Sequence, residues 1–303
     1  MTADLTNPIF TNEANAIEHM EASRWPNGAT CPHCGSDAVR KMGGETQKGM
    51  YLCNACRDKF TVRTGTVFER SHIPLHKWLL ATHLIASSKK GISAHQMHRM
   101  LGITYKSAWF MAHRIREAMK PASGLPPLGG NGGTVEADET YIGNKSSEPR
   151  GKRGPKGKRA VLALVERGGA VRSFHVEDVR SPTLHSVIST NVSPEAHLRT
   201  DEAIHYRTIG WNFASHETVN HSKDEYARGD VHSNTIEGVF SIFKRGMVGT
   251  YQHCGEQHLH RYLAEFDFRY SNRKALGVSD VGRAARILKG AEGKRLTYRQ
   301  NTH

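Results

Sequence analysis

Long apolar segments are absent from the sequence, and that absence excludes whole classes of protein. The most apolar stretch, residues 78–86, is far shorter than the roughly 20 residues that a membrane-spanning helix needs. The first 20 residues contain Asp4, Glu13 and Glu18 and no sustained apolar run, so no secretory signal peptide is predicted. We therefore expect a cytoplasmic protein that does not associate with membranes.

Cysteine is also scarce, with five in 303 residues, and in the reducing cytoplasm that we expect, paired cysteines more often hold metal than form disulfides. Four of them form two pairs, CPHC at 31–34 and CNAC at 53–56, with 18 residues between the pairs. Two CxxC turns at this spacing are typical of a zinc ribbon, and short strands are expected at 39–42 and 49–52. We predict that structural Zn²⁺ is bound by Cys31, Cys34, Cys53 and Cys56.

Acidic residues are outnumbered by basic ones. The chain has 42 Lys and Arg against 29 Asp and Glu, which gives a formal net charge of +13. An excess of this size favours a polyanionic partner, and nucleic acid is the commonest. The alternative is a basic but otherwise ordinary enzyme. The length predicts two or three domains.

Glycine and proline divide the chain into sections. Both are so frequent in residues 121–133 that neither a helix nor a strand can continue there, which indicates a linker. A basic, Gly- and Pro-rich loop is expected at 145–159. The predicted organisation is an N-terminal segment with the zinc ribbon (1–70), a helical domain (71–120), the linker (121–133), an α/β domain (134–288) and a basic tail (289–303).

The second section has helical patterns. Helices are expected over 76–88, 94–101 and 105–119, and Ser93 and Thr104 are good N-cap residues for the last two. Two helices joined by a short turn with a glycine form the arrangement that places a helix in the major groove of DNA. We therefore predict a helix-turn-helix; the alternative is a small helical bundle without a ligand.

The third of these helices would make the main DNA contacts. Tyr105, Lys106 and Ser107 stand at its leading end, where base edges are read. Farther along the helix, Arg114 and Arg116 are predicted to contact phosphates. Together with the basic charge, this pattern predicts double-stranded DNA as the partner.

Acidic residues in the fourth section fall in segments that otherwise predict burial. Residues 134–143 are predicted as a strand, and its alternation puts Glu136 and Asp138 on one face. A carboxylate in a buried strand is unusual unless it binds something. Asp201 ends a later predicted strand, and Glu237 lies on an amphipathic helix.

The expected order of elements is strand, strand, strand, helix, strand, helix, with acids on the first strand, the fourth strand and the last helix. This is the plan of a ribonuclease-H-like fold with a mixed sheet. The last helix is expected to be capped by Ser233, and Lys244 lies two turns, roughly 10 Å, beyond Glu237 on the same face. The predicted fold class is multidomain α+β: a zinc ribbon, a helix-turn-helix and a ribonuclease-H-like α/β catalytic domain.

The chain resembles the insertion-sequence DDE transposases that carry an N-terminal zinc ribbon, the ISXO2-like group. With the ribbon, the resemblance spans about residues 25–273. It is carried by VEADETYIG at 135–143, Asp201, HSNTIEG at 232–238, KRG at 244–246 and the segment 259–270.

The resemblance implies a catalytic triad of Asp138, Asp201 and Glu237. These carboxylates would hold catalytic Mg²⁺, two ions in all, with Mn²⁺ as a substitute. Asn234 is a rival for the third position or a helper, because some relatives use asparagine there. Glu136 is left as a supporting acid.

Lys244 and Arg245 would grip the DNA backbone near the cut, and Lys244 would also support the triad. The implied protein is a nucleoid-associated transposase of bacterial type. It would bind terminal inverted repeats, cleave DNA and transfer strands by transesterification, as a homodimer or higher oligomer. The alternatives are a DNA-binding regulator derived from such an enzyme, and a nuclease or resolvase that cuts without joining.

Overall fold

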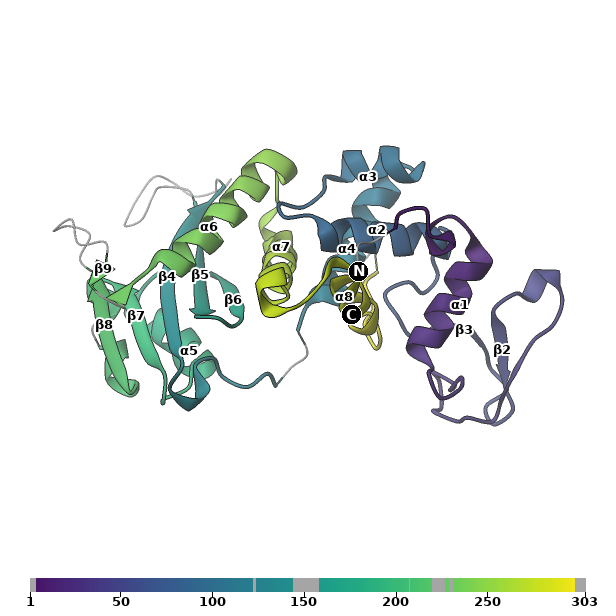
Figure 1. The fold of residues 1–303 in the computed structure, drawn as a ribbon, viewed down its shortest axis with the longest axis horizontal. Coiled ribbons are helices and arrows are strands. Elements are labelled where there is room, and N and C mark those ends of the chain that lie inside the picture. Colours follow the sequence, from purple (N-terminus) through teal and green to yellow (C-terminus); the bar gives the residue numbers. More distant parts are fainter. Residues whose placement is uncertain are drawn as a thin grey trace. The chain divides into compact units, whose positions relative to one another are not determined.

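The computed structural model describes residues 4–121, 124–143, 158–206, 208–219, 227–228 and 231–297. Most of the basic loop expected at 145–159 and the end of the basic tail lie outside the described residues. The chain divides into two compact units (Figure 1). We call them the ribbon–helix unit (Met1–Ser88, Ile92–Lys120 and Val278–His303) and the sheet unit (Lys89–Gly91 and Pro121–Gly277).

The ribbon–helix unit begins with helix α1 (Glu13–Arg24), whose N-cap Asn12 accepts hydrogen bonds from two backbone amides. A three-stranded antiparallel sheet follows, in the order β1 (Val39–Lys41), β2 (Met50–Cys53), β3 (Lys59–Thr61). The first two strands confirm the strands predicted between the cysteine pairs. Tyr51 and Phe60 pair across β2 and β3 and pack with Trp25 on one face of this sheet.

Three helices follow, as predicted: α2 (Leu75–Ser87), α3 (Ala94–Leu101) and α4 (Tyr105–Met119). The predicted caps are present, because the side chains of Ser93 and Thr104 accept hydrogen bonds from the first turns of α3 and α4. Gly102 ends α3 with a φ of 58°, the left-handed conformation that glycine adopts without a steric penalty.

Helix α8 (Asp280–Lys289) completes the ribbon–helix unit by packing on α2 and α4. The segment after it pairs with the loop at 65–67, where Val67 N donates to Ala291 O at 3.1 Å and Gly293 N donates to Gly65 O at 2.9 Å. We expected the α/β domain to reach residue 288, but the compact sheet unit ends at Gly277. Helical periodicity identifies a face to be buried, and it does not say which partner buries it.

The sheet unit contains a five-stranded mixed sheet in the order β6-β5-β4-β7-β8. β4 pairs antiparallel with β5 and parallel with β7, and β7 pairs parallel with β8. The strands are β4 (Thr134–Ile142), β5 (Arg159–Glu166), β6 (Val171–Val176), β7 (His197–Asp201) and β8 (Ser215–Val219). The mixed sheet was expected; β8 was not, because its sequence is polar and short.

Helices cover both faces of this sheet (Figure 1). Helix α5 (Ser181–Asn191) buries Leu184 against one face. Helices α6 (Asn234–Gly246) and α7 (Glu256–Ser271) cover the other face, and a π-helical turn, Met247–Tyr251, extends α6. The short strands β9 (Ala227–Arg228) and β10 (Val231–His232) precede α6.

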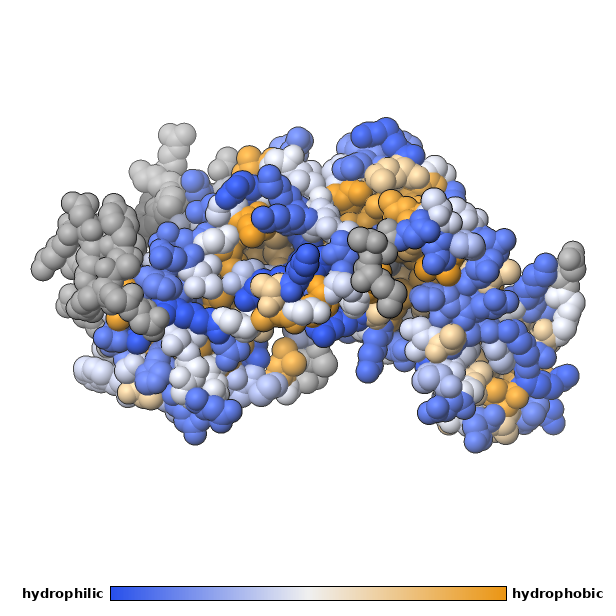
Figure 2. Space-filling model, viewed as in Figure 1, coloured by the Kyte–Doolittle hydropathy of each residue, from blue (hydrophilic) through white to orange (hydrophobic). Residues whose placement is uncertain are grey.

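Hydrophilic side chains dominate the drawn face of both units (Figure 2). Among the described helices, none combines the length and the apolar character that crossing a membrane requires.

Candidate functional site

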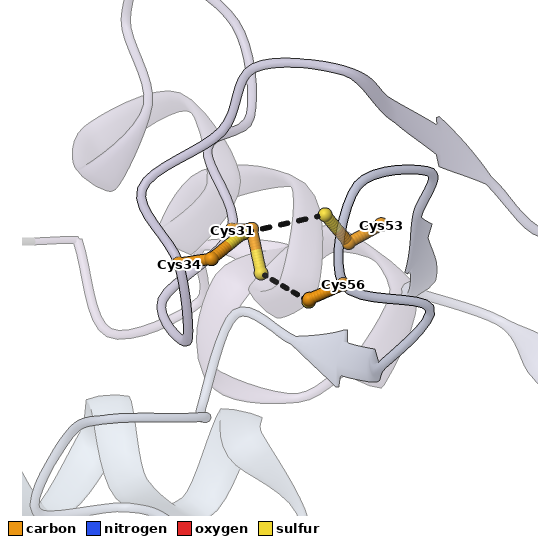
Figure 3. Close-up of side chains that lie close together, drawn as sticks. All are labelled: Cys31, Cys34, Cys53 and Cys56. Carbon is orange, nitrogen blue, oxygen red and sulfur yellow. Dashed lines mark hydrogen bonds between the residues drawn. The ribbon is translucent and has the colours of Figure 1, made fainter.

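The two cysteine pairs come together in the ribbon–helix unit (Figure 3). The four Sγ atoms lie within 4.8 Å of one another, with Cys31 Sγ 3.7 Å from Cys56 Sγ and Cys34 Sγ 3.6 Å from Cys53 Sγ. Each cysteine pair lies in a tight turn, and the residue after the second cysteine completes that turn. Gly35 and Arg57 have positive φ values of 77° and 66°, and each donates its N–H to the carbonyl four residues back.

The sulfur geometry fits tetrahedral zinc. A Zn–S bond of about 2.3 Å requires sulfurs about 3.8 Å apart, close to the two distances observed. Backbone N–H groups of Cys56 and Ala55 lower the pKa of the Cys53 thiol to about 7, whereas burial and the neighbouring thiols raise the pKa of the Cys56 thiol to about 12. A bound metal would favour the thiolate form of both. Four sulfurs fill every tetrahedral position, so the site is structural and not catalytic.

Strand β4 directs alternate acidic side chains to opposite faces of the large sheet. Asp138 is half-buried, and its pKa is raised to about 7. Burial is the main cause; the negative charges of Glu139, Asp201 and Glu237 add to it. The three predicted acids therefore lie in one electrostatic neighbourhood although the sequence separates them widely.

Asp201 and Glu237 occupy different settings around Asp138. Asp201 ends β7, is half-buried and accepts the backbone N–H of Ala203 at 3.0 Å. Glu237 is exposed on the first turn of α6, where Ser233 Oγ donates to its Oε1 at 2.8 Å. Within the described ranges, only the four cysteines bring three or more ligand atoms within 4.8 Å, so the carboxylates lie farther apart than the sulfurs do.

Two residues predicted at the start of α6 and on β4 differ from expectation. Ser233 was expected to cap the helix, but its side chain makes no capping hydrogen bond. Glu136, expected to support the metal site, is 0% exposed and uses both carboxylate oxygens elsewhere. Its Oε1 accepts from Arg167 Nε at 2.7 Å, and its Oε2 accepts from Ile236 N, in the first turn of α6, at 2.9 Å. Because both oxygens are engaged, Glu136 is not a free ligand.

The remaining predicted residues of α6 are exposed. Asn234 begins the helix, three residues before Glu237, and Lys244 and Arg245 lie in its last turn. Arg245 is held by a hydrogen bond to the side chain of Ser241. These positions are accessible to a ligand, as their predicted roles require.

Glu139 has a buried partner that the sequence did not predict. Tyr206 is fully buried, and its hydroxyl donates to Glu139 Oε2 at 2.6 Å. Its pKa is raised well above the usual value, first by burial and then by Glu139, Asp138 and Asp201. His205 Nε2 lies 3.4 Å from Glu139 Oε1. A tyrosine a few residues after an aspartate gives no sequence signal of this contact.

The residues expected to bind DNA from α4 divide into two groups. Tyr105 is 45% exposed and stacks on His95 with ring centroids 4.2 Å apart, and Lys106 is also exposed. Ser107 is half-buried beside them. This leading end of the helix is accessible, as predicted.

Arg114 and Arg116 correct the prediction of phosphate contacts, because they are only 6% and 2% exposed. Arg114 donates to the carbonyl of Glu69 at 2.6 Å and lies over the ring of Trp78. Burial lowers its pKa to about 10. Arg114 is thus a packing residue within the ribbon–helix unit.

Comparisons with known proteins identify two domains in the chain. Residues 130–271 match the ISXO2-like transposase domain, and residues 11–59 match the transposase zinc-ribbon domain, as the cysteine spacing predicted. The chain is also 28% identical, over 278 residues, to an uncharacterized protein in transposable element ISH50 of Halobacterium salinarum. That alignment covers 86% of this chain and 91% of the relative.

Proposed function

The chain belongs to the ISXO2-like transposases that carry an N-terminal zinc ribbon, and from this premise we propose that it cleaves and joins DNA with the aid of divalent metal. The observation that carries the proposal is the convergence of charge on Asp138. Burial, joined by the negative charges of Glu139, Asp201 and Glu237, raises its pKa to about 7, an arrangement that costs free energy until a cation neutralises it. Asp138, Asp201 and Glu237 would be the metal ligands.

The donor set suits Mg²⁺, with Mn²⁺ as a substitute, because hard cations prefer carboxylate oxygens. Two such ions, when bound, would supply electrostatic stabilisation for phosphoryl transfer. Asn234, exposed on the same first turn as Glu237, is the rival for the third position.

The proposed reaction has two balanced steps in a ribonuclease-H-like domain. A water oxygen attacks a phosphodiester at the element end, loses a proton, and the departing 3′-oxygen takes up a proton to become a 3′-hydroxyl. That hydroxyl then loses its proton and attacks a target phosphodiester, the 3′-oxygen of the cut target strand leaves and takes up a proton, and one phosphodiester replaces another without ATP. Lys244 and Arg245, exposed in the last turn of α6, would hold the DNA backbone.

Element ends would be recognised by the ribbon–helix unit. Helices α3 and α4, joined through Gly102, suit a helix-turn-helix whose second helix enters the major groove. Tyr105 and Lys106 are exposed at its leading end, and the net charge of +13 supports binding that weakens steeply with salt. Two ends must be processed together, so we expect a homodimer or larger assembly on DNA.

Substitution of Asp138 by Asn tests the catalytic assignment. The variant should retain zinc and bind element ends as wild type does, while cleavage with Mg²⁺ or Mn²⁺ falls to background. Asp178→Asn is a matched control, because that carboxylate lies before α5 and bonds to Thr183 Oγ1 at 2.7 Å. Wild-type cleavage by the Asp138 variant would refute the metal site.

Joining requires a separate assay. A pre-cleaved end with a free 3′-hydroxyl and a supercoiled target should yield a joined product. Cleavage of intact ends without any joined product would favour the nuclease, and end binding without either reaction would favour the regulator.

A further inference from the structure

We propose that Glu136 is a positioning residue for DNA cleavage: from strand β4 it caps helix α6 and so fixes Glu237 relative to Asp138. The inference rests on the proposed function, because it assigns Glu136 to the same metal site without making it a ligand. Glu136 and Asp138 are two residues apart on β4 and face the same side of the sheet.

Glu136 holds the start of α6 directly. Its Oε2 accepts the N–H of Ile236 at 2.9 Å, across 100 residues of sequence. The first amides of a helix have no partner within the helix, and an acidic group beside them is favoured by the helix dipole. Ser233, at the N-cap position, does not provide this acceptor; its hydroxyl donates to Glu237 instead.

Arg167 provides a second connection between β4 and the start of α6. From the turn after β5 it donates through Nε to Glu136 Oε1 at 2.7 Å and through a terminal nitrogen to the carbonyl of His232 at 2.8 Å. The amide of Arg167 also donates to Thr134 O at 3.0 Å, which ties this turn to the start of β4. Contacts at His232 and Ile236 therefore bracket the N-cap of α6.

The cost of burying this carboxylate indicates a specific role. Glu136 is 0% exposed and the side chain of its partner Arg167 is 17% exposed, and an ion pair so largely removed from water often contributes less stability than apolar residues of the same volume, because both charges lose hydration. This pair instead specifies where α6 begins. Glu237 follows Ile236 directly, so the bound amide is one residue from the proposed ligand. Fraying of this first turn would move Glu237, and Asn234 with it, away from Asp138.

Glu136→Gln is the test, and Glu265→Gln is its matched control. Glu265 is also 0% exposed, lies in the same sheet unit and pairs with an arginine, Arg269, but it sits on α7 and accepts from Tyr251, after the end of α6, not from its first turn. Glutamine at position 136 is uncharged and has only one acceptor oxygen, so it cannot pair with the charge of Arg167 and also accept the N–H of Ile236. The Mg²⁺ and Mn²⁺ concentrations needed for half-maximal cleavage should rise about tenfold or more. Zinc content and end binding should not change.

The control separates positioning from stability. Glu265→Gln should lower the melting temperature to a similar degree and leave the metal dependence at the wild-type value. If Glu136→Gln folds poorly, Arg167→Lys, which keeps the charge but loses the contact with His232, should give a smaller shift in the same direction. Metal dependence that is unchanged in both Glu136→Gln and Arg167→Lys overturns the inference.

Failure of the inference and of the proposed function would look different. If wild type cleaves only with added metal and Asp138→Asn does not cleave, the proposed function stands, and the Glu136 result judges the positioning role alone. If Asp138→Asn cleaves like wild type, the metal site itself is wrong, and the positioning role falls with it.

Discussion

At the scale of single residues, the raised pKa of Asp138 has a measurable consequence for the free energy of unfolding. Its pKa is about 7 in the folded protein without bound divalent cations, against a usual value of 3.8. The folded state therefore binds this proton more tightly than the unfolded chain does. Stability contributed by the protonated form is complete below about pH 4 and is lost as the pH rises toward 7, by up to about 4 kcal/mol.

Asp138→Asn should therefore be more stable than wild type at pH 8 without added Mg²⁺ or Mn²⁺, and the difference should shrink as the pH falls toward 5. Urea unfolding at several pH values measures this. Added Mg²⁺ should stabilise wild type and not the variant, because ligand binding to the folded state adds stability only where the site exists. A pH-independent difference would mean that the carboxylate is not shifted as described.

The proposed triad of Asp138, Asp201 and Glu237 stays a prediction, and the sequence did not predict the contacts that their neighbours make. The order of elements placed acids on two strands and a helix, and the resemblance to the transposase family implied that Asp138, Asp201 and Glu237 act together. Glu136 also lies in a segment that otherwise predicts burial. Only its partners Arg167 and Ile236, which are distant in the sequence, distinguish a residue that caps a helix from a metal ligand. Arg114 was predicted wrongly for a related reason. A charged residue on a helix is expected to face solvent, but the guanidinium of Arg114 is buried against a backbone carbonyl and an aromatic ring, which the sequence does not place there.

At the scale of elements, local signals predicted α3 and α4 well, because caps and end signals such as Ser93, Thr104 and Gly102 act within a few residues. Strands β3 and β8 were missed. Both are short, and their edge positions bury few side chains, so their alternation is weak. The ribonuclease-H-like interpretation of the sheet depended on the order of elements, and its antiparallel and parallel pairings could not be obtained from any single segment.

The zinc ribbon is an element whose fold should depend on its metal. Cys31→Ser should lower zinc well below one ion per chain and open the turns and strands near residues 31–61 to protease, because thiolate coordination supplies the folding free energy of so small a sheet. Binding to element ends should weaken. Metal analysis and limited proteolysis measure these effects.

Cys254→Ser is the control for that experiment, because this cysteine lies in the sheet unit, outside the four-sulfur cluster. Its zinc content should equal that of wild type. Full zinc occupancy in Cys31→Ser would contradict the four-cysteine site.

At the scale of the whole molecule, the ribbon–helix unit is discontinuous in sequence. Residues 278–297 lie beyond both family matches, at 11–59 and 130–271, yet they belong to the unit that holds the ribbon. Arg283 Nε donates to the carbonyl of Ala86 at the end of α2, and Lys294 Nζ donates to the carbonyl of Lys120 at 2.6 Å. Stability of the ribbon–helix unit should therefore depend on helix α8.

Two glycines at α8 test this dependence with the same chemical change. A Cβ at Gly290 would lie 2.4 Å from the carbonyl oxygen of Ala118 in α4, so Gly290→Ala must displace one helix from the other. We expect a loss of about 1–3 kcal/mol in the unfolding of the ribbon–helix unit. At Gly282, inside α8, the nearest atoms to such a Cβ are 3.4 Å away, and alanine should stabilise the helix by up to about 1 kcal/mol. Urea unfolding followed by tryptophan fluorescence measures both changes. Equal stabilities for the two variants would mean that α8 is not packed on α4 in solution, since the helix propensities alone predict that Gly290→Ala does no harm.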